Sequence, residues 1–321
     1  MATGACLCLG LPACSETLML VVPNAGSASV PPGRFLKGRD EELPGVRAGW
    51  SAGMLEAALL GVSVWGPGLE GWGASRGVLA GEMDYVPRES PAPSPSMLGG
   101  TERRRAGPVV RLALAVASEA AGQAQGAVGI EPGALRSVFG SSNGDGVVVG
   151  GILDALSKGA AGERVVSPTQ FHNSVHNAAA GYWSIAHGSR EPATCLGAHD
   201  WTWAAALLKA MVEVVAEGAP VLLCCYDHPL PAPLDALRPT GAAFGAGLVL
   251  GPVQAGFSTL RVSFGSGEAV MGQPMGPGLD WLVGANAIGR ALPLLRVLAR
   301  GGGGKVELGY MEGRLVVEVV G

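Results

Sequence analysis

The chain has 321 residues, of which 48% are hydrophobic and only 15% charged, a composition that excludes intrinsically disordered and highly charged proteins. Its 22 basic and 26 acidic residues give a formal net charge of -4, which favours neither a nucleic-acid backbone nor an anionic membrane as a partner. The 52 glycines and 23 prolines follow no G-X-Y period, so they indicate a globular protein with many turns rather than collagen.

The sequence predicts a cytoplasmic protein without a transmembrane segment. The best uncharged candidate for a membrane span, residues 241–260, is interrupted by glycines and a proline, which favours strand and turn over a membrane-spanning helix. Residues 1–13 are apolar but lack the leading Lys or Arg of a secretory signal. The six cysteines match neither a zinc pattern nor a disulfide framework, so we expect reduced thiols and neither a metal nor a cofactor.

Residues 1–53 differ in composition from the rest of the chain, with small residues, a Pro31-Pro32 pair and a charged patch. We expect them to form an extension, disordered or upstream of the native start, before one domain over residues 54–321. An apolar segment from Met54 ends in the turn Gly66-Pro67-Gly68 and predicts a buried strand. The proline-rich residues 87–95 predict an extended surface segment.

Three consecutive arginines, Arg103, Arg104 and Arg105, precede a helical pattern that runs to Ala120. We interpret them as the solvated start of that helix, with an anion or carrier-protein docking site as the alternative. Next, Ser137–Gly140 predicts a short strand, followed by a Gly-rich loop and a helix, which together form an α/β unit. The loop lacks the G-x-G-x-x-G spacing, so nucleotide binding is disfavoured.

The remaining pattern alternates helices and strands, which predicts a layered α/β protein. The expected helices are Asn177–His187, Trp201–Glu217 and Trp281–Ala299. The expected strands are Val221–Tyr226 and Ala243–Leu250, followed by a hairpin over Lys305–Val320, and Pro192–Ala198 is expected to be a strand or a loop. The glycines before Lys305 do not match a phosphate loop, because Ala299 and Val306 replace the required glycine and hydroxyl residue.

The segment Asn177–Pro192 resembles the stretch before the nucleophile in β-ketoacyl synthases, in which an Asn-x-Ala-Ala-Gly helix leads through a glycine and a proline into a short strand. Trp201–Ala210 resembles the nucleophile helix of that family, and Phe244–Leu250 its Gly-Ala-Gly strand. The resemblance covers residues 54–255. It implies a thiolase-like, layered α/β/α fold in which the second half, residues 256–321, is abbreviated.

The chain departs from the family at the catalytic positions. In the family, a nucleophilic cysteine follows the proline by about eight residues and caps a buried helix, where its pKa is lowered. Here that position is Asp200, which cannot form the thioester and which we expect to cap the helix. The two histidine motifs of the family are also missing, since the last histidine is His228.

The run Phe171–Gly181 resembles the short chain-length-factor type of ketosynthase-like protein found in bacterial aryl polyene, polyketide and fatty acid pathways. This resemblance implies a non-catalytic partner of a catalytic ketosynthase, bound across the sheet edge and helices near residues 167–200 and served by an acyl carrier protein. It also implies that bulky side chains limit the growth of the acyl chain. The candidates for the tunnel or interface are Tyr182, Trp183, Trp201, Trp203, His172, His176 and Asn177, with plain core packing as the alternative for the aromatic residues.

Two other functions stay open. A small thioester-handling enzyme would use Cys195 with His199, or Asp200 with His199 to decarboxylate a malonyl group; the alternative for Cys195 is a buried strand residue. A homodimeric module for a carrier protein would use the three arginines. His172 and His176 are spaced like metal ligands but lack a third ligand, and the cysteines at 224 and 225 are expected in the core.

Overall fold

A computed structural model describes residues 50–51, 53–158, 165–270 and 272–321, all within one compact unit. The extension predicted for residues 1–53 therefore lies almost entirely outside the described residues. Its described end includes the short strand β1 (Trp50–Ser51), which pairs with the next strand of the chain. No helix in the described ranges is long and apolar enough to cross a bilayer.

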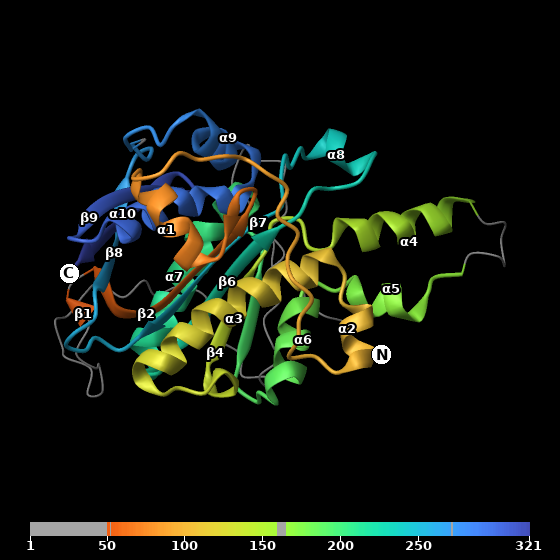
Figure 1. The fold of residues 1–321 in the computed structure, drawn as a ribbon, viewed down its shortest axis with the longest axis horizontal. Helices are drawn as coiled ribbons and strands as arrows, with labels where there is room; N and C mark the ends of the chain where they lie inside the picture. The colour runs from red at the N-terminus through yellow and green to blue at the C-terminus, as the bar shows by residue number, and fades with distance from the viewer. Residues whose placement is uncertain (1–49, 52, 159–164, 271) are drawn as a thin grey trace, which may run out of the picture. The chain divides into compact units, whose positions relative to one another are not determined.

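The described strands form a single mixed sheet in the order β5-β4-β6-β7-β2-β8-β10-β9, to which β1 and β3 add short pairings with β2 (Figure 1). β4 pairs in parallel with β5 and β6, and all other pairings are antiparallel. The strands are β2 (Met54–Gly66), β3 (Leu69–Glu70), β4 (Arg136–Gly140), β5 (Ala193–Leu196), β6 (Val221–Asp227), β7 (Phe244–Gly251), β8 (Thr259–Ser266), β9 (Gly304–Tyr310) and β10 (Gly313–Val320).

Helices cover both faces of this sheet, which confirms the predicted α/β/α layering. One face packs against α3 (Pro108–Val128) and α6 (Ala178–His187), and Figure 1 shows α3 running across β2, β7 and β6. The other face packs against α1 (Trp72–Ala80), α7 (Thr202–Glu217), α9 (Pro277–Ala285) and α10 (Leu292–Arg300). The shorter elements are α2 (Gly100–Arg105), α4 (Gly146–Lys158), α5 (Pro168–Asn173), α8 (Leu234–Leu237) and the 3-10 helices η1 (Pro132–Ala134), η2 (His199–Trp201) and η3 (Ala287–Ala291).

Strand β6 shows why the sequences of the central strands are continuous apolar runs. Its residues alternate between the two hydrophobic clusters, with Leu223 and Cys225 facing one layer of helices and Leu222 and Cys224 facing the other. All of β6 is buried, because a strand covered on both faces has no polar side. The two adjacent cysteines predicted to lie in the core are fully buried.

Glycines allow α3 to lie close to the sheet. A Cβ atom on Gly61 would lie 2.2 Å from the backbone oxygen of Ala120, and one on Gly247 would lie 2.9 Å from a methyl group of Val116. Gly61 also follows a register shift between β2 and β7. Side chains at these positions would push the helix off the strands, so the Gly-Ala-Gly pattern in β7 has a packing reason.

Two predicted helices are divided in the structure. The arginines 103–105 end α2 instead of opening the long helix, because Gly107 and Pro108 start a new helix at α3, with the proline in its first turn. The helix predicted over Trp281–Ala299 is split at Asn286, whose backbone is extended. The side chain of Asn286 accepts a hydrogen bond from the Ile288 amide and donates one to the Ala242 carbonyl, both at 2.8 Å. The sequence pattern does not predict α1 or β8, which the structure contains.

Candidate functional site

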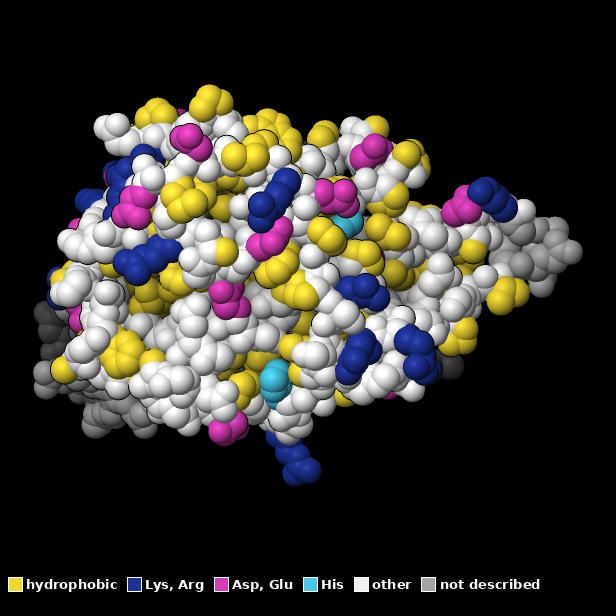
Figure 2. Space-filling view, in the orientation of Figure 1, with side chains coloured by type: hydrophobic (Ala, Val, Ile, Leu, Met, Phe, Trp, Pro, Cys, Tyr) yellow, Lys and Arg dark blue, Asp and Glu magenta, His cyan; other side chains and the backbone are white. Residues whose placement is uncertain are grey.

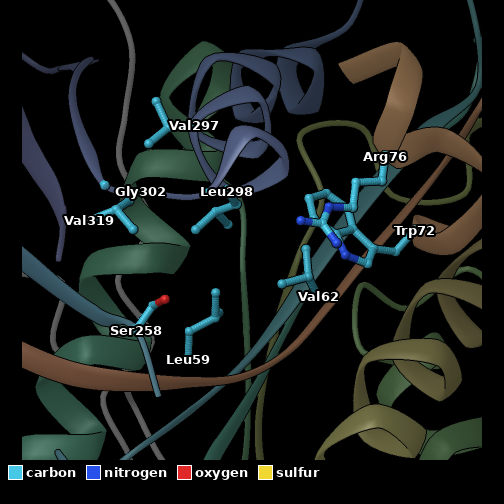
Figure 3. Close-up of a pocket in the computed structure, with 11 residues that line it drawn as sticks. Leu59, Val62, Trp72, Arg76, Ser258, Val297, Leu298, Gly302 and Val319 are labelled. Carbon is cyan, nitrogen blue, oxygen red and sulfur yellow. The ribbon is translucent and has the colours of Figure 1, made fainter. Parts of the chain in front are cut away.

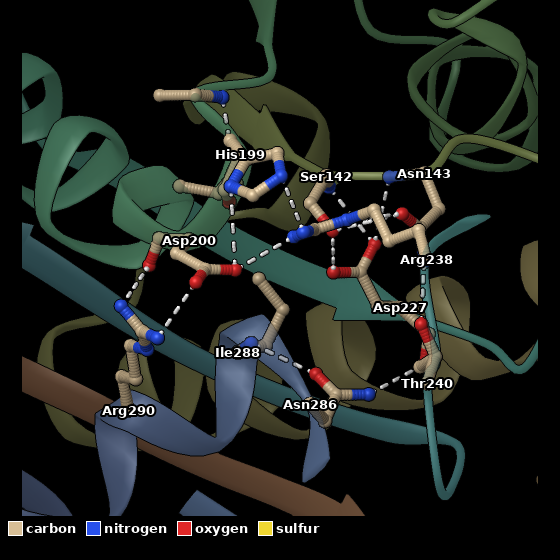
Figure 4. Close-up of polar contacts among 12 residues, drawn as sticks. Ser142, Asn143, His199, Asp200, Asp227, Arg238, Thr240, Asn286, Ile288 and Arg290 are labelled. Carbon is tan, nitrogen blue, oxygen red and sulfur yellow. Dashed lines mark hydrogen bonds and ion pairs between the residues drawn. The ribbon is translucent and has the colours of Figure 1, made fainter. Parts of the chain in front are cut away.

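Polar residues gather where the carboxyl ends of β4, β5 and β6 meet, the edge at which α/β sheets commonly bind ligands (Figure 4). The loop after β4 contributes Ser141, Ser142 and Asn143, and the turn after β5 contributes His199 and Asp200. The β6–β7 connection contributes Arg238, and η3 contributes Arg290.

Asp227 at the end of β6 organises the Gly-rich loop after β4. Its buried carboxylate accepts hydrogen bonds from the Ser141 hydroxyl at 2.8 Å, from the Ser142 amide at 2.9 Å and from the Ser142 hydroxyl at 2.5 Å. Burial raises the pKa of Asp227 despite the opposing hydrogen bonds from Ser142 and Ser141. The loop amides of residues 142 and 143 already bind this carboxylate, so they are not offered to an external phosphate.

Asp200, which the sequence resemblance predicts to stand in place of the nucleophile, is held by two arginines. The Arg238 Nη2 atom donates to Asp200 Oδ1 and the Arg290 Nη2 atom donates to Asp200 Oδ2, both at 2.9 Å. We call these three residues the Asp200 clamp. Burial alone would raise the pKa of Asp200, but the hydrogen bond from Arg238 and the positive charges of Arg290 and Arg238 outweigh it, so the pKa lies below the ordinary value.

The expected capping role of Asp200 is not seen. Trp201 is the N-cap residue of α7, without a side-chain cap, and both carboxylate oxygens of Asp200 point to the arginines instead (Figure 4). Just before Asp200, His199 adopts a positive φ of 50°, which makes the turn between β5 and α7 tight. The Thr202 hydroxyl closes this turn by donating to the His199 carbonyl at 2.7 Å.

Arg238 links the turn between β5 and α7 to the Gly-rich loop. Its Nε atom donates to Asn143 Oδ1 at 2.9 Å, and its Nη1 atom lies 2.6 Å from His199 Nε2. Asn143 in turn donates to the Thr240 hydroxyl at 2.9 Å. Segments far apart in the sequence are therefore bonded to one another through the guanidinium of Arg238.

This arrangement does not support covalent catalysis at Asp200. Both carboxylate oxygens bind guanidinium groups, and the lowered pKa makes the carboxylate a weak base. Burial raises the pKa of the Cys195 thiol to about 11, so this cysteine is not an activated nucleophile at neutral pH. Within the described ranges no hydrogen bond joins Cys195 to His199, which contacts Arg238 and Asp200 instead.

The four aromatic candidates do not come together. Tyr182 and Trp183 are buried in the layer of α3 and α6, whereas Trp203 is buried on the opposite face of the sheet. Only Trp201 reaches the surface, with 39% of its area exposed. The structure thus places three of the four in the hydrophobic core, on two different faces.

The two spaced histidines have separate surroundings. The His172 ring packs edge-on against Tyr182, with ring centres 6.1 Å apart, while His176 Nε2 lies 2.9 Å from the Ser141 carbonyl oxygen. Asn177 is the N-cap residue of α6 but makes no capping bond with its side chain. No group of three potential metal ligands occurs in the part of the chain that the structure describes.

The three arginines of α2 are not equivalent. Arg103 donates to the carbonyl groups of Leu98 and Ser96 and so holds the preceding loop. Arg104 and Arg105 are exposed, and Figure 2 shows basic side chains over α2 on the surface beside α5. Arg105 lies 3.7 Å from Glu102, a weak pairing at a surface.

Two cavities lie away from the clamp. One of about 170 Å³ lies between β2 and α10; Arg76 and Trp72 lie beside each other there, across from Val297 and Val319 (Figure 3). The other, of about 360 Å³, lies between α3 and the extended segment around residues 93–97. Neither is lined by a residue of the clamp.

The residues predicted from sequence do not include the arginines of the clamp or Asp227. An acidic residue at the end of the apolar run Val221–Tyr226 was a usable signal for Asp227, because a buried charge requires partners. Arg238 and Arg290 lie 38 and 90 residues after Asp200, and no local pattern marks them.

The family model described as "Beta-ketoacyl synthase, N-terminal domain" matches residues 80–271. No curated protein matches the chain.

Among solved structures, a chain of the ketosynthase ApeO in complex with its chain length factor ApeC from Xenorhabdus doucetiae is 17% identical, with a TM-score of 0.62 over 83% of this chain and 100% of that chain. The ishigamide ketosynthase/chain length factor is 16% identical, with a TM-score of 0.57 over 83% and 99%. The type II polyketide complex AntDE:AntF, an acyl-carrier protein with its ketosynthase, is 10% identical, with a TM-score of 0.60 over 83% and 99%. The TM-scores show a shared fold. Because the family model matches more than half of its residues, the chain belongs to the β-ketoacyl synthase family.

Proposed function

We propose that this protein is a chain length factor: a non-catalytic subunit that pairs with a catalytic ketosynthase in polyketide or fatty-acid-type biosynthesis of the aryl polyene kind. The observation that carries the proposal is the Asp200 clamp, because a carboxylate that accepts hydrogen bonds from two arginines occupies the position that the sequence resemblance assigns to the nucleophile. A condensing reaction needs a thiolate to accept the acyl group. The catalytic partner supplies that cysteine and the two histidines.

The solved structures of similar fold support this assignment. Two of them hold a ketosynthase together with its chain length factor, and the third holds a ketosynthase with an acyl-carrier protein. By analogy, the partners of this chain are a catalytic ketosynthase and an acyl carrier protein. Similarity of fold does not by itself establish a function. The clamp adds a chemical argument, because a carboxylate cannot form the thioester that condensation requires.

The surface suited to the ketosynthase lies at the β5 end of the sheet. β5 ends the strand order, so one of its edges is unpaired within the described sheet and can accept another strand. Nearby, α4 and α5 lie side by side and project from the sheet, and they expose apolar side chains (Figures 1 and 2). These are Val147, Leu153, Leu156 and Phe171, each at least 40% exposed.

Under this proposal the four aromatic candidates have different roles. Trp201 is exposed and follows Asp200, so it is the aromatic side chain that can contact a partner or an acyl chain. Tyr182, Trp183 and Trp203 stabilise the layers behind it. Arg104 and Arg105 carry the docking of the acidic carrier protein, and this docking weakens with salt because the side chains are exposed.

A co-expression experiment tests the pairing. The tagged chain is produced with the ketosynthase of its own host, and the two are purified through the tag and analysed by native mass spectrometry. We expect a stoichiometric complex that Leu153→Glu weakens. The matched control is Phe264→Glu, a change at a 63% exposed apolar side chain on β8, which leaves the complex intact. A monomer or homodimer from the wild-type co-expression would contradict the proposal.

A further inference from the structure

The larger of the two cavities lies under the segment between α1 and α2, residues 81–99, which we call the strap. Figure 1 shows the strap, in orange, crossing α3 on its way to α2. Near α2 the strap is held by Arg103, which donates to the Ser96 carbonyl at 2.9 Å. Residues 93–97 of the strap form one wall of the cavity, and β2, β3 and α3 supply the others. Its volume of about 360 Å³ lies in the range of small-molecule binding sites.

The charges that line this cavity are all negative. Glu70 and Glu119 line it, and none of its lining residues is basic. Glu70 is exposed and pairs with Arg88 at 3.2 Å, so a cation and solvent compensate its charge. Glu119 on α3 is half-buried, and in the described part of the chain no Lys or Arg pairs with it. The cavity therefore contains one carboxylate that lacks a cation.

Backbone amides compensate the charge of Glu119 only in part. Its Oε1 atom accepts a hydrogen bond at 2.5 Å from the amide of Trp72, in the first turn of α1, where the helix dipole favours an anion. Burial nevertheless raises the pKa of Glu119 against the lowering effect of the amides of Trp72, Val64 and Gly73. A positive charge beside this carboxylate would offset the cost of its burial.

Two further side chains of the cavity favour an ammonium group as that charge. The Nε1 atom of Trp65 donates to the Ser90 carbonyl at 2.8 Å, so the indole offers a ligand its aromatic ring, which attracts cations, and not its hydrogen. The Ser118 hydroxyl oxygen is buried and has no hydrogen-bond partner among the described residues, so it can accept a hydrogen bond from a ligand. The apolar part of the lining comes from Pro93, Pro95, Met97 and Ala115.

We propose that this cavity binds a small organic molecule that carries a primary ammonium group on an apolar stem. The ammonium group donates hydrogen bonds to the Glu119 carboxylate and the Ser118 hydroxyl, and the stem lies against Trp65 and the apolar lining. A carboxylate ligand would be repelled by the two glutamates, and a neutral ligand would leave the charge of Glu119 without a cation. This inference goes beyond the proposed function and does not depend on it.

Ligand-observed NMR on the full chain tests the site with three probes of similar shape and different charge. At neutral pH benzylamine carries the ammonium group, benzyl alcohol is neutral and benzoate is anionic. We expect saturation transfer from the protein to benzylamine, and a dissociation constant about tenfold higher for benzyl alcohol, the factor that one hydrogen bond to a charged group represents. Benzoate should bind more weakly still. Failure of benzylamine to bind, or equal binding of the three probes, would overturn the proposal.

Three substitutions locate the binding. Glu119→Gln removes the charge but keeps an oxygen that can accept from the Trp72 amide, and it should weaken benzylamine binding about tenfold. Ala115→Leu fills the cavity with the carboxylate still in place, so it should abolish binding whether or not Glu119→Gln folds. Glu89→Gln removes an exposed carboxylate of the strap that does not line the cavity, and this control should keep the wild-type affinity. Wild-type affinity in either of the first two variants would overturn the proposal.

Discussion

Removal of the Asp200 carboxylate should destabilise the fold by an amount that the geometry of the clamp allows us to work out. The carboxylate accepts two charge-assisted hydrogen bonds, each 2.9 Å long, from Arg238 and Arg290. Its side chain is 39% exposed, so solvent screens both ion pairs. We assign roughly 1 kcal/mol to each pair, a value between those of exposed ion pairs and of charged hydrogen bonds in the interior.

The substitutions of Asp200 by Ala and by Asn should therefore lower the free energy of unfolding by different amounts. Asp200→Ala loses both bonds and should lower the free energy of unfolding by about 2 kcal/mol, whereas Asp200→Asn keeps one oxygen acceptor and should lose about 1 kcal/mol. For a domain of this size, a loss of about 2 kcal/mol lowers Tm by roughly 4 °C. Thermal and urea unfolding of the full chain measure both changes.

The dependence of stability on pH in the acidic range independently checks the contribution of Asp200. The pKa of Asp200 is lowered in the folded protein, so its contribution is present above the ordinary carboxyl pKa and is lost as the pH falls through the lower folded value. The difference between wild type and Asp200→Ala should shrink on strong acidification. Asp235→Asn, a change at an exposed carboxylate on α8, is the control and should leave Tm unchanged. If Asp200→Ala is as stable as the wild type at neutral pH, our account of the clamp is refuted.

Other predictions follow from single residues. Gly61→Ala should destabilise the fold by about 3 kcal/mol or more, because its Cβ atom would meet the Ala120 carbonyl oxygen at 2.2 Å; a wild-type Tm would show that α3 is not held this close. Asp227→Asn should cost about 2 kcal/mol in urea unfolding, since one amide oxygen cannot accept all the bonds of the buried carboxylate, and an unchanged midpoint would argue against that network. Cys195 should react with iodoacetamide far more slowly than a free thiol at neutral pH, as its pKa of about 11 requires; rapid alkylation would revive the thioester-enzyme alternative.

The fold could be predicted from sequence where the local pattern is strong. Continuous apolar runs predict β6 and β7, because burial on both faces of a strand leaves an unambiguous signal. Helical runs of small and apolar residues predict α6 and α7. The apparent helix over residues 281–299 concealed a break at Asn286, since asparagine is tolerated in helices and only its buried partners explain the extended backbone. β8 alternates apolar and polar residues over a short span and lies next to an uncharged glycine-rich run, so its signal was weak.

The site was predictable only in part. The spacing from Pro192 located Asp200, but its two guanidinium partners come from distant segments that only the tertiary structure brings together. The aromatic candidates were chosen by size, and three of them lie in the core because large side chains stabilise packed layers as well as they line tunnels. Exposure singled out Trp201, which sequence alone could not do.

Acyl mapping tests the central claim most directly. The purified complex of this chain and its ketosynthase is incubated with an acyl carrier protein that carries a labelled acyl group, and each chain is digested and analysed by mass spectrometry. We expect a thioester on the partner's cysteine and none on any residue of this chain, Cys195 included. A stoichiometric acyl adduct on this chain would contradict a non-catalytic role.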